Sequence, residues 1–109
     1  MTTPYLLIND LIAHAGAIQP GSIVSRTFAK EGTLKGILFT FDAGQELSEH
    51  TAGVPAVIHM LQGEASVTLG GESHELVTGA WVHMPAHLKH SVHAKTPLIM
   101  LLLMLGAGA

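Results

Sequence analysis

Short runs of large apolar and β-branched residues alternate along the chain with turn-forming glycines and prolines. Residues 65–69 alternate apolar and polar side chains, and Gly70 and Gly71 then supply the positive φ angles of a tight hairpin turn before residues 73–77. Such short, regularly punctuated runs are typical of an all-β sandwich or barrel and not of a helical or βαβ fold. The predicted strands are residues 23–29, 34–41, 46–50, 56–61, 65–69, 73–77, 81–84, 89–94 and 98–105.

Three segments need a separate interpretation. Residues 7–15 are predicted to form one short helix, with Asn9 or Asp10 as its N-terminal cap. Residues 97–105 are the most apolar segment, but they are shorter than the roughly 20 residues that span a bilayer, so they predict a strand buried on both faces. Residues 1–8 carry no basic residue and only a short apolar run, unlike an export signal. We therefore expect a soluble cytoplasmic protein with no membrane partner.

The composition predicts a single globular domain that covers residues 1–109. Hydrophobic residues make up 48% of the chain and charged residues only 12%. A chain this short exposes much of its surface, so the shortage of charge indicates that a partner covers some apolar surface. The expected partner is a second copy. Its interface would use the N-terminal strands, within about residues 1–41, and the edge formed by residues 98–105.

Charge and cysteine content exclude several classes of function. The formal net charge is −3 and the five lysines and arginines are scattered, so no basic stripe is available for a nucleic acid. The absence of cysteine excludes a disulfide framework, a thiolate metal site and a cysteine nucleophile. The glycines do not form a phosphate-binding loop, and no nucleotide cofactor is expected.

The chain contains eight histidines, and the neutral imidazole is a common ligand for transition metals. Two segments contain histidines at regular distances from glycine and proline. Residues 44–63 contain a glycine, five residues, a histidine and a later glycine, and residues 79–90 contain a glycine, five residues, a proline and a histidine five positions on. The residues at these positions are Gly44, His50 and Gly63 in the first segment and Gly79, Pro85 and His90 in the second. The two spacings resemble the two motifs of the cupin family.

The resemblance implies a small antiparallel double-stranded β-helix, the jelly-roll or cupin barrel, with His50 and His90 in its pocket. Two further positions that usually hold a metal in this family fall on Ala52 and Ala56. Two imidazoles make an incomplete ligand set, because catalytic sites normally carry three protein ligands. Any divalent metal (Fe, Mn, Ni or Zn) is therefore expected to be weakly held.

Two residues are candidates for a third metal ligand. His87 occupies the motif position of a glycine, in the loop before His90, and Glu46 shares a strand face with His50 if side chains alternate regularly. The expected pocket lining is Ala52, Ala56, Ile58, Met60, Trp81 and Val92.

Two classes of function remain open. The first is a metal-dependent enzyme acting on a small polar molecule, and dioxygenase, isomerase, lyase and decarboxylase activities all occur on this fold. The second is a non-catalytic, metal-free barrel that binds or senses a small ligand. The sequence slightly favours a barrel that binds, or once bound, a metal and whose activity is unassigned, with the metal-free barrel as the alternative, and it does not identify the substrate.

Overall fold

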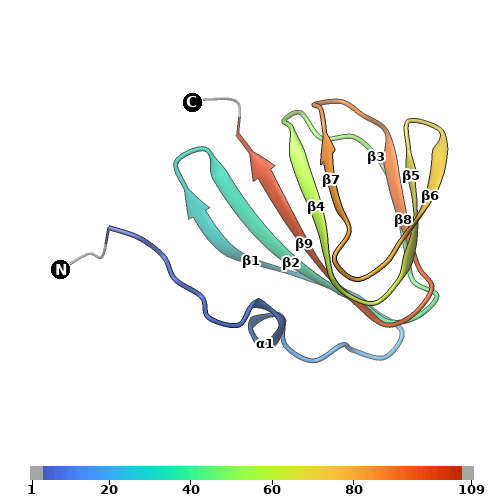
Figure 1. Ribbon diagram of the computed structural model, residues 1–109, viewed down its shortest axis with the longest axis horizontal. Helices are drawn as coiled ribbons and strands as arrows, with labels where there is room; N and C mark the ends of the chain where they lie inside the picture. The colour runs from blue at the N-terminus through green and yellow to red at the C-terminus, as the bar shows by residue number, and fades with distance from the viewer. Residues whose placement is uncertain (1–3, 107–109) are drawn as a thin grey trace.

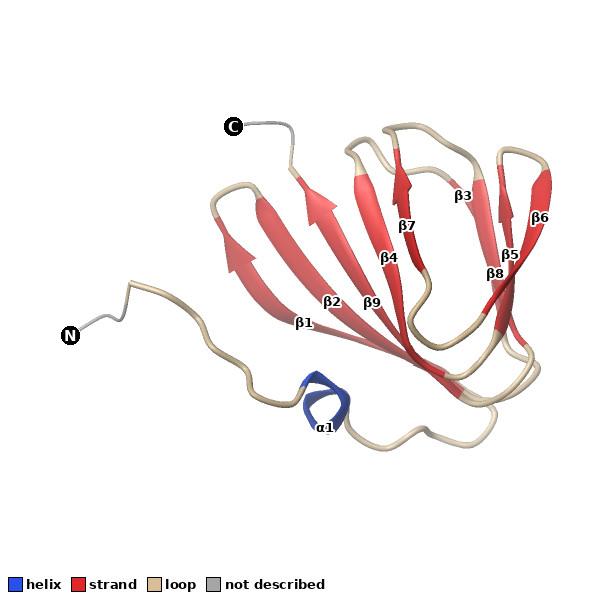
Figure 2. Ribbon diagram, in the orientation of Figure 1, coloured by secondary structure: helices blue, strands red, loops and turns tan. Residues whose placement is uncertain are grey.

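The computed structural model describes residues 4–106. Within them, nine strands form two facing sheets, and one short helix precedes the strands (Figures 1 and 2). The ends of the predicted domain, residues 1–3 and 107–109, lie outside the described residues. The elements are α1 (Leu11–Ala15), β1 (Ile23–Glu31), β2 (Leu34–Phe41), β3 (Glu46–His50), β4 (Ala56–Gln62), β5 (Ala65–Leu69), β6 (Glu72–Leu76), β7 (Trp81–Met84), β8 (His90–Ala94) and β9 (Leu98–Leu105).

Each predicted strand is confirmed, with ends that differ by two residues at most. The tight turn between β5 and β6 is also confirmed, since Gly70 and Gly71 have φ angles of 57° and 92°. The helix is shorter than predicted. It begins at Leu11 because the Asp10 side chain accepts a hydrogen bond from the backbone N–H of Ala13 at 3.1 Å, which caps the first turn.

The strands form a five-stranded sheet in the order β1-β2-β9-β4-β7 and a four-stranded sheet in the order β3-β8-β5-β6. All pairings are antiparallel, and most connections pass from one sheet to the other, which is the jelly-roll arrangement that the sequence predicts. One expectation is wrong. β9 is a central strand between β2 and β4, not an edge, because a strand this apolar on both faces is best covered by neighbours on both sides.

The main hydrophobic core lies between the two sheets, and a smaller cluster lies outside the five-stranded sheet beneath α1. β9 contributes to both, since Leu98 and Met100 point inward while Ile99 and Leu101 point toward α1. The prediction of a strand buried on both faces is thus confirmed. No helix within residues 4–106 is both long and apolar enough to cross a membrane.

Candidate functional site

One end of the barrel gathers three loops, which we call the loop end: residues 51–55, 70–71 and 85–89 (Figure 1). Two backbone hydrogen bonds connect these loops. The His87 N–H donates to the Ala52 carbonyl at 2.8 Å, and the Gly70 N–H donates to the Lys89 carbonyl, also at 2.8 Å. The loops are therefore held in a defined arrangement around the ends of β3 and β8.

His50 and His90 meet at this end of the barrel. They are opposite each other in the β3–β8 register, and their ring centroids are 4.2 Å apart with an interplanar angle of 58°. His90 is 6% exposed and lies on the inner face of its strand with the buried Val92, whereas His50 is exposed at the rim. The structure thus brings together the two histidines that the sequence analysis selected.

Both rings are oriented in the same way by the backbone. Nδ1 of His50 lies 2.7 Å from the Ser48 carbonyl oxygen, and Nδ1 of His90 lies 2.9 Å from the Leu88 carbonyl oxygen. A carbonyl oxygen can only accept, so each Nδ1 carries the hydrogen and each neutral ring has its lone pair on Nε2. Within the described residues no hydrogen bond uses Nε2 of either ring. A backbone partner of this kind is common for histidines that bind a metal.

Five of the six residues predicted to line the pocket lie in the core or at the loop end. Ala56, Ile58, Met60 and Val92 are almost fully buried in the core between the sheets and form a packed apolar floor beneath the histidines. Ala52 lies half-buried in a loop at the loop end.

Trp81 is a correction to the expected pocket lining. It is 60% exposed and lies on the outer face of β7, because the next residue, Val82, packs into the core opposite Ile58. Successive side chains of a strand point to opposite faces, so Trp81 cannot share the interior with Val82. Alternation along the strand predicts that Trp81 and His83 share a face, but the sequence does not indicate whether that face is the inner or the outer one.

Glu46 also lies on the outer face, contrary to the expectation that it accompanies His50. In β3, Leu47 packs against the core, and Glu46 faces His93 with its Oε1 at 3.7 Å from the His93 Nδ1. The register is irregular between Leu47 and His50, where two residues of β3 oppose one residue of β8. This β-bulge reverses the alternation, so Glu46 and His50 point to opposite faces. Leu47, the one large apolar residue of this strand, was the sequence feature that could have indicated the correct face.

His87, the other candidate for a third ligand, is exposed in the loop before β8. It has a φ of 69°, and it is the one non-glycine residue with a positive φ in the described part of the chain. A φ of this sign lies in the left-handed region, which glycine adopts readily, and this explains why the second cupin motif has a glycine at the position of His87. Across residues 4–106 no group of three or more histidine, aspartate or glutamate side chains is placed to hold a metal, so the structure does not bring His87 to the histidine pair.

A polar pair on β6 was missed by the sequence analysis. Leu69 is opposite both His90 and Glu72 in the sheet register, which places Glu72 in the same cross-strand row as His90. His74 is two residues further along, and its Nε2 lies 3.6 Å from the Glu72 carboxylate, with both side chains well exposed. Leu76 packs against the core, and alternate residues of a strand share a face, so Glu72 and His74 also lie on the inner side of the sheet.

The chain belongs to the cupin family: the family described as "Cupin domain" matches residues 37–105, which is more than half of the sequence. No protein with a curated description matches the chain.

Solved structures support the same fold. A conserved protein of unknown function from Streptococcus pyogenes is 28% identical, with a TM-score of 0.84 over 100% of this chain and 93% of that protein. A cupin superfamily protein from Desulfitobacterium hafniense is 27% identical, with a TM-score of 0.78 over 83% of each chain. A salicylate 1,2-dioxygenase from Pseudoaminobacter salicylatoxidans is 18% identical, with a TM-score of 0.74 over 87% of this chain and 30% of that one, and it shares the fold alone.

Proposed function

We propose that the protein binds a small polar molecule at the loop end of the barrel through His50 and His90, with a divalent metal ion held between the two rings. One observation carries the proposal. The rings are in contact, and each is fixed by a backbone carbonyl in the tautomer that keeps Nε2 available as a ligand.

The spacing of the rings fits a shared ion. An imidazole bound at about 2.0–2.1 Å has its ring centre roughly 3.2 Å from the metal. Two ring centres around one ion therefore lie roughly 4.5 Å apart when the two metal–nitrogen bonds meet at a right angle, and roughly 5.2 Å apart at the tetrahedral angle. The observed separation of the ring centroids is 4.2 Å. A bound divalent ion would act as a Lewis acid that polarises an oxygen atom of the small molecule.

The metal would be weakly held. Ala52 and Ala56 have no donor atom, so water or the bound molecule would occupy the remaining positions around the ion. An imidazole must be neutral to bind, so metal affinity would also fall as the pH drops into the range in which histidines become protonated.

A cobalt(II) titration at neutral pH, followed by calorimetry and visible absorption, tests the metal site. We expect the wild type to bind one equivalent, and His50→Ala and His90→Ala each to lower the affinity at least tenfold. His83→Ala is the matched control, because His83 is exposed on the outer face of β7 and should leave the affinity unchanged. A wild type that binds no cobalt, or an equal loss in all three variants, would contradict a metal at the histidine pair.

Replacement of Ala52 provides a gain-of-binding test. Ala52 is half-buried in a loop and not in the packed core, so Ala52→His can add an imidazole near the pair without disturbing the floor. A third neutral ligand should tighten cobalt binding at least tenfold. An affinity equal to that of the wild type would mean that residue 52 does not face the ion.

A metal-free binding site is the second candidate function, and the absence of a three-residue ligand group in residues 4–106 favours it. Each Nε2 would then accept a hydrogen bond from a hydroxyl or ammonium group above the apolar floor. Glucose provides a simple hydroxyl-rich probe. The test uses protein from which EDTA, itself then removed, has taken any bound metal. If glucose shifts the ring NMR signals of His50 and His90 in this protein and cobalt(II) does not, the metal-free site is the correct interpretation.

A further inference from the structure

A small cleft of about 180 Å³ lies at the turn of the β1–β2 hairpin, beside the end of β9 and the loop that connects β3 to β4. Among the residues that line it are Lys30, Thr33, Lys35, Val54 and Met104. Val54 belongs to one of the loops of the loop end, and the hairpin turn lies at that same end of the barrel (Figure 1). The cleft is therefore at the end of the barrel where the histidine pair lies.

The two lysines of the cleft are a pair of like charges. Lys30 is directly opposite Lys35 in the β1–β2 register. Like charges directly opposite each other on two strands repel and destabilise the pairing, and an anion bound beside both of them removes this repulsion. Within residues 4–106 neither ammonium group has an ion pair or a hydrogen bond, whereas Lys95 is paired with Glu75.

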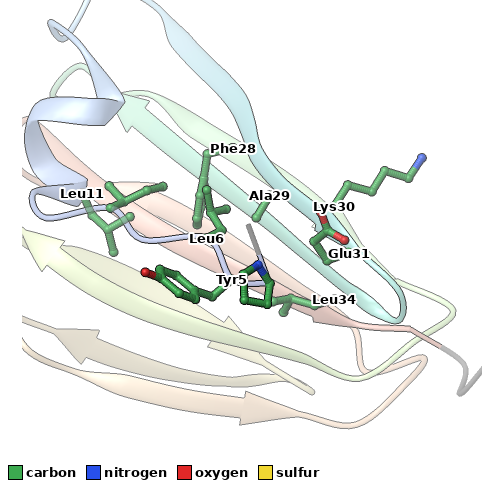
Figure 3. A pocket seen from close by; sticks show the side chains of 10 residues that line it. Tyr5, Leu6, Leu11, Phe28, Ala29, Lys30, Glu31 and Leu34 are labelled. Carbon is green, nitrogen blue, oxygen red and sulfur yellow. The ribbon is translucent and has the colours of Figure 1, made fainter. Parts of the chain in front are cut away.

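The acid next to the pair in the sequence faces the other way. Glu31 follows Lys30 in β1, and successive side chains of a strand point to opposite faces. Glu31 lines the larger groove between residues 4–8 and the hairpin, and it does not line the cleft. Figure 3 shows this groove, with the ammonium group of Lys30 directed away from its apolar side chains. Glu31 therefore does not neutralise the positive charge of the cleft.

We propose that the cleft binds an anionic group, a carboxylate or a phosphate, through Lys30 and Lys35, and that the molecule bound by the histidine pair is a small acid. The second part rests on the proposed function. Charged lysine groups form strong hydrogen bonds to such oxygens, and the Thr33 hydroxyl can donate another. Val54 and Met104 give the cleft an apolar floor, and a lower local dielectric strengthens the attraction between the charges.

The size of the cleft limits what it can hold. Pockets that enclose a whole drug-sized ligand have volumes of roughly 300–1,000 Å³, and this cleft is smaller. It therefore fits one anionic group, while the rest of the molecule extends toward the histidine pair.

The sheet register connects the cleft with the apolar floor beneath the histidines. Lys35 is opposite Met104 in β9, and Met104 is opposite Ala56 in β4. This row lies on the inner face, because Met104 is two residues from Leu102, which packs against the main core. Neighbouring strands are about 4.8 Å apart, so the backbones of Lys35 and Ala56 are roughly 10 Å apart. The long, flexible stem of lysine spans much of this distance, so one molecule with two polar ends can reach both sites.

An NMR titration of the metal-free full chain tests the anion site. Sodium phosphate and sodium acetate are added separately, with the ionic strength held constant by sodium chloride. We expect at least one of them to cause saturable shifts of the Gly32 and Thr33 amide signals, and Lys30→Gln/Lys35→Gln to weaken this binding at least tenfold. Lys89→Gln is the matched control, because Lys89 is an exposed lysine of the loop end that does not line the cleft.

The two anions distinguish the possible groups. A response to phosphate alone indicates a phosphate group, a response to acetate alone indicates a carboxylate, and either response, or both, supports the anion site. No saturable shift with either anion, or equal affinities in the double variant and the control, would overturn it. Circular dichroism checks that both variants are folded.

Adipate, a flexible dicarboxylate, tests whether the cleft and the histidine pair hold one molecule. In cobalt(II)-loaded protein we expect calorimetry to show adipate binding at least tenfold tighter than acetate. Lys30→Gln/Lys35→Gln should remove this gain and leave the cobalt affinity unchanged. Adipate that binds no tighter than acetate, or equally to wild type and double variant, would overturn the shared ligand. Failure of the proposed function gives a different result, a wild type that binds no cobalt, and the adipate titration is then made with metal-free protein.

Discussion

Replacing His87 with glycine should stabilise the protein. His87 has a φ of 69°, a left-handed conformation that costs an L-residue with a side chain about 1–2 kcal/mol. Its side chain is exposed, so little packing is lost on truncation. Its backbone N–H donates to Ala52, and this hydrogen bond survives any substitution except proline.

The size of the effect follows from two opposing terms. Glycine relieves the cost of the left-handed backbone, but it also gives the unfolded chain more freedom, which costs roughly 0.4–1 kcal/mol. A net gain of about 0.5–1 kcal/mol remains. For a domain near this size, 1 kcal/mol shifts Tm by roughly 4–8 °C, so we expect an increase of about 2–8 °C.

Thermal unfolding of wild type, His87→Gly and His87→Ala measures this gain. Alanine keeps the Cβ atom and therefore the left-handed cost, so its Tm should not rise. A His87→Gly protein no more stable than His87→Ala would refute the reasoning. The same variants test the third-ligand hypothesis, because cobalt affinity falls in both if His87 binds the metal and is unchanged in both if it does not.

Three further predictions concern stability and pH. Thr40 is almost fully buried and its hydroxyl has no hydrogen-bond partner in the described residues, so Thr40→Val should raise the free energy of unfolding by about 1 kcal/mol in urea denaturation. Gly63→Ala should lower Tm by 10 °C or more (on the order of 2 kcal/mol), because Gly63 has a φ of 97° and an added Cβ would collide with the Pro97 carbonyl oxygen. The Ser66 hydroxyl, and then Lys95, lower the pKa of Glu75, so Ser66→Ala should raise that pKa in an NMR titration. Because the folded-state pKa is depressed, this small stabilisation is present above the ordinary carboxyl range and is lost as pH falls through the folded value; an unchanged pKa in Ser66→Ala would contradict the role of the hydroxyl.

Much of the fold and the central pair of the candidate site follow from local patterns in the sequence. The strands, the Gly70-Gly71 turn and the doubly buried 98–105 segment depend on short-range periodicity and on backbone angles that glycine favours, and all are visible within a few residues. His50 and His90 could be selected together because two motif spacings, each local, identified them independently.

The tertiary structure decided which face each of the remaining side chains occupies. Alternation along a strand gives only relative directions, and a single bulge reverses them, as the β3 bulge does between Glu46 and His50. For Trp81, the direction depends on Val82 packing against a strand that is distant in the sequence. The groove between residues 4–8 and the β1–β2 hairpin likewise exists only because the N-terminal segment lies against that hairpin. Faces and grooves depend on pairings between distant segments, and a local pattern carries no information about these pairings.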